Sequence, residues 1–129
     1  MTRYVVDSWA WIEYLEGTSL GEEVRSKISD DTNEVFTHVV SVAEIISKVR
    51  RSNKDADAAW NAIVTNSKVF PISGIESKDA GLLHAAIKSK YPNFGLADAF
   101  VLSAARKLGG KVLTGDPDFR GLQDVVMLA

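Results

Sequence analysis

The chain has 129 residues, of which 46% are apolar and 25% charged, proportions typical of one soluble globular domain. It contains no cysteine, which excludes disulfides and thiolate metal sites, so a metal could bind only through oxygen or through His38 and His84. The net charge of −2, from 17 acidic and 15 basic residues, does not indicate a nucleic-acid-binding protein, so any basic surface would have to be local.

The first half of the chain predicts strands that alternate with helices. Tyr4–Val6 is a short apolar run that ends at Asp7, which is typical of a buried strand. Asp7 and Ser8 both favour the start of a helix, and Gly17 favours its end. The elements expected here are a strand over 4–6, helices over 8–16 and 19–29, a strand over 35–37, a helix opened by Ser41 and a helix over 55–67.

The second half continues the alternation. Pro71 predicts that the strand over 69–72 lies near an edge of the sheet, because proline cannot donate a ladder hydrogen bond. Strands alternating with helices favour a parallel sheet covered on both faces. We therefore expect an α/β fold with about five parallel strands and a single domain over 1–129. The remaining elements are a helix over 76–90, a break at 92–95, an apolar helix over 96–108 ended by Gly109, a strand over 111–114 and a fifth strand over 125–128.

Neither a membrane segment nor a secretion signal is evident. No apolar run approaches the roughly 20 residues that a membrane span requires. The first residues, MTRYVVDSW, lack the long apolar region of a signal peptide. We therefore expect a cytoplasmic protein without membrane contacts.

Four acidic side chains from distant segments are expected at one edge of the sheet. Asp7 ends the first strand, and Asp116 follows the strand over 111–114, so both lie where functional groups gather in open parallel sheets. Helices antiparallel to the strands begin at this same edge. Glu44 and Asp98, which we expect in the first turns of their helices, should therefore lie there too.

These carboxylates call for a counter-charge. Two carboxylates ~4 Å apart repel by roughly 4 kcal/mol at an effective dielectric of 20. Four together would either take up protons or bind a cation. Oxygen ligands without cysteine select Mg²⁺, Mn²⁺ or Ca²⁺, and Mg²⁺ held by a few carboxylates suits the hydrolysis of phosphate esters.

Each acid also has a purely structural interpretation. Asp7 could serve only as a helix cap, and Ser41–Glu44 has the pattern of a capping box. Asp98 lies in a helix that is apolar on nearly every side, so its charge needs a partner, although Gly95 or Asn93 could cap that helix instead. Asp118, in the turn after Asp116, could be a turn cap or a further ligand. The two histidines, His38 and His84, are expected to be structural.

A negative pocket that binds nucleic acid would need a basic rim. The candidates for such a rim, which could equally be solvated helix faces, are Lys48, Arg50, Arg51, Lys54, Arg106, Lys107 and Arg120. Trp9 falls on the same side of its helix as Glu13 and Glu16, away from the apolar side. It is therefore either an exposed aromatic of a binding surface or a side chain covered by a loop.

At these residues the chain resembles PIN-domain ribonucleases, and more narrowly VapC-type toxins of toxin–antitoxin pairs, over nearly its whole length. The similarity begins in YVVDSWAWIEYLEG and continues in HVVSVAEI. It is most specific in GLADAFVLSAARKLGGKVLTGDPDFRGL and weakest over 50–75. The resemblance implies a sheet of about five parallel strands and a Mg²⁺- or Mn²⁺-dependent endoribonuclease.

The resemblance also implies roles for individual residues. Matched by position, the family's acidic quartet, which would hold one or two metal ions, corresponds to Asp7, Glu44, Asp98 and Asp116. Asp118 matches a further acid of some members, and Ser8 and Thr114 match small hydroxyl residues beside the site. An RNA substrate, a homodimer and a small antitoxin protein that blocks the site are implied as well.

Three alternatives remain open at this point. A housekeeping RNA-processing nuclease would have the same site, and a structural or RNA-binding member would have an inert one. A receiver-like phospho-acceptor domain would share the length, the sheet and an acidic Mg²⁺ pocket. It would need a second acid beside Asp7, where Ser8 stands, and a lysine after the last strand, where none follows Val126.

Overall fold

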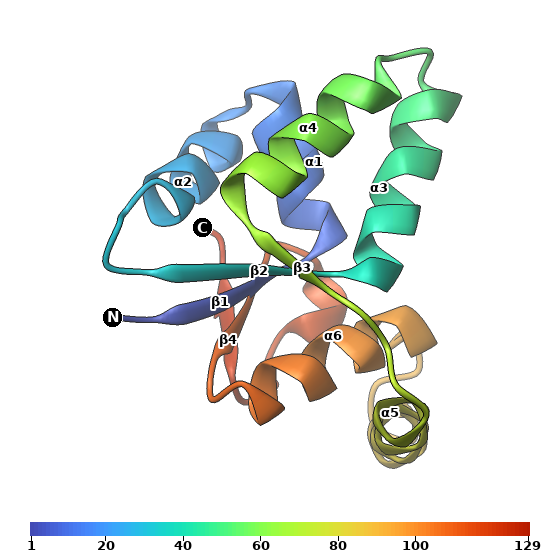
Figure 1. Cartoon of the computed structure of the whole chain (residues 1–129). Helices are drawn as coiled ribbons and strands as arrows, with labels where there is room; N and C mark the ends of the chain where they lie inside the picture. Colours follow the sequence, from blue (N-terminus) through green and yellow to red (C-terminus); the bar gives the residue numbers. More distant parts are fainter.

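Five parallel strands form one sheet between two layers of helices (Figure 1). The computed structural model describes residues 1–129, and the strand order is β3-β2-β1-β4-β5. The strands are β1 (Arg3–Val6), β2 (Glu34–His38), β3 (Lys68–Phe70), β4 (Lys111–Thr114) and β5 (Val125–Met127). The helices are α1 (Ser8–Glu16), α2 (Ser19–Ile28), α3 (Val39–Arg51), α4 (Ala56–Asn66), α5 (Gly74–Lys88), α6 (Leu96–Lys107) and the 3-10 turn η1 (Pro117–Phe119). None of these helices combines the length and the apolar character needed to cross a membrane.

The alternation of side chains along β1 divides the interior into two cores. Tyr4 and Val6 pack with α1 to α4, whereas Val5 points to the opposite face and packs with α6. On β4, Leu113 and Val112 divide in the same way. Successive strand residues face opposite sides of a sheet, so β1 and β4 are buried on both faces. Figure 1 shows the result, with α1 to α4 on one side of the sheet and α5 and α6 on the other.

The structure confirms the predicted fold class and the order of the elements. β3 is an edge strand, as expected, but it spans Lys68–Phe70, so Pro71 follows its last residue instead of lying within the predicted strand over 69–72. Gly109 has a φ of 67° just beyond α6, a left-handed conformation that favours glycine at a helix end. The strand order also rules out the receiver-like alternative, because that fold has the order 2-1-3-4-5.

The predicted start of the third helix is wrong. α3 begins at Val39, and the side chain of His38 caps it by accepting a hydrogen bond from the Val40 amide at 3.0 Å. Ser41 lies inside the helix, buried and without a hydrogen-bond partner, so Ser41 and Glu44 form no capping box. Glu44 consequently lies in the second turn of α3 rather than the first. Because β2 runs straight into α3, His38 can cap a helix whose N-cap the Ser–Glu pattern alone places three residues later, at Ser41.

α5 also begins two residues before its predicted start. Ser73 caps it by accepting from the Glu76 amide at 3.2 Å, and the Ser73 hydroxyl donates to the Glu76 carboxylate at 2.9 Å. This Ser-x-x-Glu sequence has the pattern of a capping box and was readable in the sequence, although Glu76 accepts from the Ser73 hydroxyl and not from its backbone amide.

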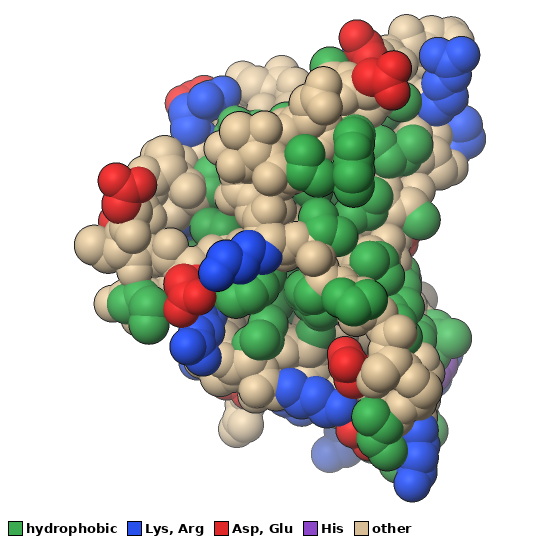
Figure 2. Space-filling model, in the orientation of Figure 1, with side chains coloured by type: hydrophobic (Ala, Val, Ile, Leu, Met, Phe, Trp, Pro, Cys, Tyr) green, Lys and Arg blue, Asp and Glu red, His purple; other side chains and the backbone are tan.

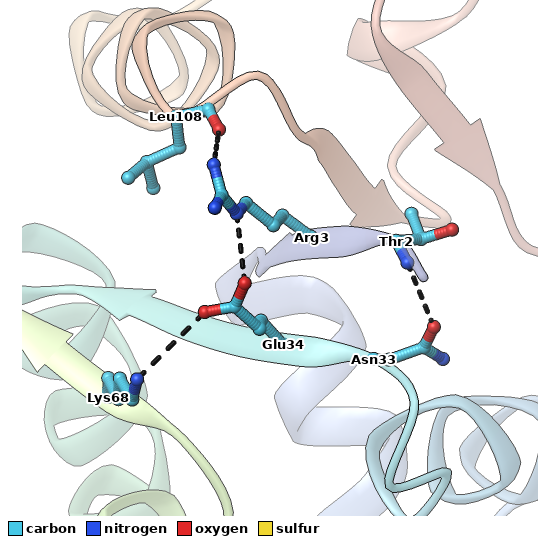
Figure 3. A network of polar contacts seen from close by, with 6 residues as sticks. All are labelled: Thr2, Arg3, Asn33, Glu34, Lys68 and Leu108. Atoms are coloured by element: carbon cyan, nitrogen blue, oxygen red, sulfur yellow. Dashed lines mark hydrogen bonds and ion pairs between the residues drawn. The ribbon is translucent and has the colours of Figure 1, made fainter.

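Charges at the amino edge of the sheet are balanced by direct ion pairs (Figure 3). Glu34 of β2 pairs with Arg3 of β1 at 3.0 Å and with Lys68 of β3 at 3.9 Å. Arg3 also donates to the carbonyl oxygen of Leu108, just beyond α6, at 2.9 Å. Farther along the same edge, Asp124 pairs with Arg106 and Lys111. Glu34 and Asp124 therefore each have basic partners.

Candidate functional site

Five acidic side chains lie at the opposite, carboxyl edge of the sheet. They are Asp7 after β1, Glu44 in α3, Asp98 in the first turn of α6, and Asp116 and Asp118 after β4. The charges of Asp98, Glu44 and Asp116 all act on Asp7. The structure thus brings together the four acids that the sequence analysis placed at this edge.

Three of these acids form the tightest group. Asp98, Asp116 and Asp118 each offer one carboxylate oxygen, and the three oxygens lie within 4.8 Å of one another. All three side chains are half-buried, so the group is open to solvent on one side. Such a set of oxygen donors could hold a hard divalent cation. Asp7 and Glu44 lie outside this group, on its flank.

Asp7 is held by a hydroxyl rather than used as a helix cap. It stands at the N-cap position of α1, but its side chain caps nothing. Its Oδ2 instead accepts a hydrogen bond from the Thr114 hydroxyl at 2.9 Å. Thr114 Oγ1 in turn accepts from the Asp116 amide at 3.0 Å. The small hydroxyl residue at the end of β4 therefore connects two of the acids.

The loop after β4 is shaped by Asp116 itself. Its Oδ1 accepts from the Asp118 amide at 2.9 Å and opens the turn η1. The turn cap is therefore Asp116, and no cap bond is made by Asp118. Phe119 is fully buried and packs edge-to-face against Phe94, with 5.6 Å between the ring centroids. Because Phe94 directly precedes the start of α6, this aromatic pair holds the loop beside Asp98.

Asp98 has both a structural bond and a place among the acids. Its Oδ2 accepts from the backbone amide of Gly95 at 2.8 Å, at the start of α6. This bond fixes the carboxylate at the helix N-terminus, where the helix dipole favours negative charge. Gly95 stands at the N-cap, one of the two positions anticipated for it, and the bond from its amide to Asp98 is compatible with a metal-binding role, because a carboxylate has two oxygens.

Burial and mutual repulsion disfavour the charged forms of these acids, and no basic side chain pairs with them. Burial chiefly raises the pKa of Asp7 to about 7; the bond from Thr114 opposes the rise, and three neighbouring acids add to it. Burial also raises the pKa of Asp98 to about 6. Glu44 is exposed as a residue, yet its carboxyl group is enclosed enough for burial to raise its pKa, which a hydrogen bond with Ser8 partly offsets. No ion pair of the structure includes any of the five acids.

A pocket of about 500 Å³ lies between α1 and α3 and includes Glu44 and Asp116 in its lining. Two of the predicted rim residues, Lys48 and Arg51, also line it. Arg106 and Lys107 do not belong to this rim. They lie at the far end of α6 from Asp98, and they pair with Asp124 and with Asp79. The prediction that they could form part of the rim is therefore wrong.

Trp9 lines the same pocket, and it is half-buried rather than fully exposed. A Cβ atom added at Gly115 would overlap the Trp9 ring, so the loop after β4 lies directly against it. Of the two predicted alternatives for Trp9, an exposed aromatic or a side chain covered by a loop, the second is nearer, because the loop after β4 covers part of the ring. No sequence pattern predicts the contact between Trp9 and Gly115.

The two histidines make structural contacts, as expected. His38 caps α3 and is buried, which lowers its pKa. His84 Nε2 lies 3.2 Å from the carbonyl oxygen of Phe94. Neither histidine is among the potential metal ligands that lie close together, which are Asp98, Asp116 and Asp118.

Comparison with known families agrees with this arrangement. A sequence model of the PIN domain matches residues 4–124. The chain belongs to the PIN domain family. Among curated proteins, no sequence matches this PIN domain chain.

Solved structures share the PIN fold over the full length. The toxin VapC20 of Mycobacterium tuberculosis, described as cleaving the sarcin-ricin loop, is 17% identical, with a TM-score of 0.77 over 99% of this chain and 100% of that one. The DNA-bound VapBC of Salmonella typhimurium is 14% identical, with a TM-score of 0.77 and complete coverage of both chains. VapBC2 of Rickettsia felis, bound to a promoter fragment, is 13% identical, with a TM-score of 0.74 over 98% and 97%. At these identities the likeness establishes the fold alone.

Proposed function

We propose that this PIN domain chain is a Mg²⁺- or Mn²⁺-dependent endoribonuclease and the toxin of a type II toxin–antitoxin pair. The observation that carries the proposal is the group of five acids at one sheet edge, none of which has an ion-paired base, around a buried Asp7. Membership of the PIN family and the full-length likeness to structures of VapBC systems support the same function.

The positions of the acids suggest which of them would bind which metal ion. The close trio of Asp98, Asp116 and Asp118 is suited to hold one cation, with Asp7 and Glu44 completing the site or holding a second ion. When bound, a divalent cation would activate a water molecule and stabilise the leaving oxygen of a phosphodiester.

The other groups of the site orient the acids. Thr114 donates to Asp7 and accepts from the Asp116 amide, which sets the relative positions of these two carboxylates. The Ser8 hydroxyl stabilises the charged form of Glu44 by hydrogen bonding. Neither histidine is placed to serve as a general base in this scheme, because each is occupied by structural contacts.

The toxin assignment and the partners rest on the similar structures. One of these is described as a toxin that cleaves the sarcin-ricin loop, and others are described as VapBC bound to DNA. By this likeness we propose that the chain acts on RNA and binds an antitoxin. The homodimer and the blocking of the site by a small antitoxin are proposed from the resemblance to VapC-type toxins. Co-purification with the product of a neighbouring small reading frame, together with light scattering for the dimer, would test these partners.

The activity itself is tested by incubating purified protein with single-stranded RNA. We expect cleavage with Mg²⁺ or Mn²⁺, loss of cleavage in EDTA and recovery when the metal is restored. Cleavage that continues undiminished in EDTA would contradict a metal-dependent mechanism. RNA left intact with either metal would contradict the ribonuclease activity.

A further inference from the structure

The pocket between α1 and α3 combines positive charge with an aromatic wall directly beside the acids. Its lining includes Glu44 and Asp116 on the acidic side, Lys48 and Arg51 on the basic side, and Trp9 from α1. The acidic site and this pocket are therefore continuous, and a chain-like ligand could occupy both at once.

The basic residues lead away from the acids along one face of α3. Glu44, Lys48 and Arg51 follow one another at spacings of four and three residues, which place side chains on the same side of a helix. Over these seven residues the helix rises by about 10 Å. Both basic side chains are exposed, and neither is part of an ion pair. Figure 2 shows Lys and Arg side chains gathered over the C-terminal end of α3, at its upper right.

Trp9 supplies a flat ring whose position is set by its packing. The ring is half-buried and packs against the first hydrophobic core. It also lies so close to Gly115 that any side chain there would overlap it. A ring fixed in this way loses little freedom when a ligand stacks on it. Aromatic rings beside a positively charged groove are the usual platform for single-stranded nucleic acids.

We propose that this pocket binds the nucleotide next to the cleaved phosphodiester of a single-stranded RNA. Trp9 stacks on its base, and Lys48 and Arg51 bind the phosphates that follow. This subsite rests on the proposed ribonuclease function. It adds that the RNA strand reaches the acids through the pocket between α1 and α3. A base must be unstacked to reach the ring, so the pocket selects unpaired segments over duplex RNA.

The subsite is tested by binding of a fluorescein-labelled single-stranded oligoribonucleotide, measured by anisotropy in an Asp98→Asn background in which cleavage cannot interfere. Lys48→Gln and Arg51→Gln should each reduce the slope of log K against log salt by about 0.7, because each removes one phosphate contact. Arg50→Gln is the matched control. Arg50 is exposed on the same helix but does not line the pocket, so its variant should keep the slope of the parent.

Trp9→Ala should weaken binding by roughly 5- to 150-fold, the range for loss of one stacked base. Because Trp9 also packs against Gly115, the same variants are measured with an oligoribonucleotide that carries abasic positions. Stacking predicts that the deficit of Trp9→Ala disappears on abasic RNA and that Trp9→Phe restores most of the affinity on intact RNA. An equal deficit on both RNAs would mean that Trp9 acts only through the fold, and it would overturn the proposal.

Two further outcomes separate the subsite from the nuclease activity. If the wild-type protein cleaves RNA while the Lys48, Arg51 and Trp9 variants bind like the parent, the subsite is wrong and the ribonuclease function stands. If the wild-type protein cleaves no RNA with either metal but binding depends on these three residues as described, the pocket binds single-stranded RNA, and both the ribonuclease function and the placement beside a cleaved phosphodiester are wrong.

Discussion

The Thr114 hydroxyl donates to Asp7 Oδ2 at 2.9 Å, although the two residues are 107 positions apart in the chain. Thr114 Oγ1 in turn accepts from the Asp116 amide at 3.0 Å. Thr114 and Asp7 are both buried, so neither group can exchange this bond for one to bulk water. One hydroxyl therefore sets the geometry between the acid after β1 and the acid after β4.

Thr114→Val should destabilise the protein and alter its activity. The variant keeps the shape of the side chain but leaves the Asp7 carboxylate and the Asp116 amide without their partner, at a cost of about 2–4 kcal/mol. Since the lost bond lowers the pKa of Asp7, that pKa should rise further. The pH profile of RNA cleavage should consequently move to higher pH, which initial rates between pH 5 and 9 would show.

Thr114→Ser is the control for that substitution, because it retains the hydroxyl and removes only a methyl group. Its pH profile should match that of the wild type even if its melting temperature falls slightly. A Thr114→Val protein with an unshifted pH profile would show that this hydrogen bond does not govern the protonation of Asp7.

Asp98→Asn should abolish cleavage and keep the fold. The amide oxygen of the variant can still accept from the Gly95 amide, so the start of α6 is retained. The charge that would bind the cation is lost, and we expect cleavage to fall by more than roughly 100-fold, the upper range for loss of a metal site's outer partners alone. Initial rates on RNA and circular dichroism melting measure the two effects.

The matched control for Asp98→Asn is Asp79→Asn. Asp79 pairs with Lys107 at 2.6 Å on the outer side of α5 and α6, away from the acids. This variant should cleave RNA at the wild-type rate. Comparable activity in the two variants would show that Asp98 has no role in cleavage.

Without divalent metal, the protein should lose stability as the pH rises from about 4 to 7. The pKa of Asp7 is about 7 in the folded protein and near 3.8 when unfolded, so between these values the folded state binds more protons than the unfolded state. Stability therefore falls with rising pH, by up to roughly 4 kcal/mol for this one buried group. Melting temperatures in EDTA across this range measure the effect.

Asp7→Asn isolates the contribution of Asp7. The buried His38 acts in the opposite direction, because burial lowers its pKa, but its effect is common to both proteins and cancels in their difference. In EDTA the variant should be more stable than the wild type at pH 8, and this advantage should vanish near pH 4. Mg²⁺ should stabilise the wild type more at pH 8 than at pH 5. A stability difference that does not vary with pH would contradict the raised pKa of Asp7.

Gly115→Ala should destabilise the protein by about 1–3 kcal/mol, because the new methyl group overlaps the Trp9 ring and the loop must move. Gly81→Ala is a matched control within α5. Nothing lies within 4 Å of a Cβ there, so alanine should instead stabilise the helix by about 0.4–1 kcal/mol. Urea unfolding of both variants gives the two free energies. Equal effects would mean that Trp9 and Gly115 are not in close contact.

The parts of the site that follow from topology were predictable. Asp7 and Asp116 end parallel strands, and the carboxyl ends of such strands share an edge whatever their separation in sequence. Asp98 was identifiable because a charge at the start of an apolar helix needs a partner. Glu44 was placed at the correct edge, although the N-cap of its helix lies three residues before the predicted one, because a shift of less than one turn leaves a residue near the start of the helix.

Contacts between side chains of distant segments were not predictable. No local pattern indicates that Thr114 bonds to Asp7, that Phe119 packs on Phe94, or that Gly115 makes room for a tryptophan. The same limit explains why Arg106 and Lys107 were considered for the basic rim. Their charge is visible in the sequence, whereas their pairing with acids at the far end of α6 depends on packing.

The sequence by itself determined the alternation of strands and helices, the burial of both sheet faces and the edge at which the acids gather, because periodicity and chain direction are local properties. Only the tertiary structure decided which carboxylates approach within 4.8 Å, which basic residues remain unpaired beside them and how far burial raises the pKa of Asp7. Those outcomes depend on distances between side chains many residues apart, and such distances exist only once both layers of helices have packed on the sheet.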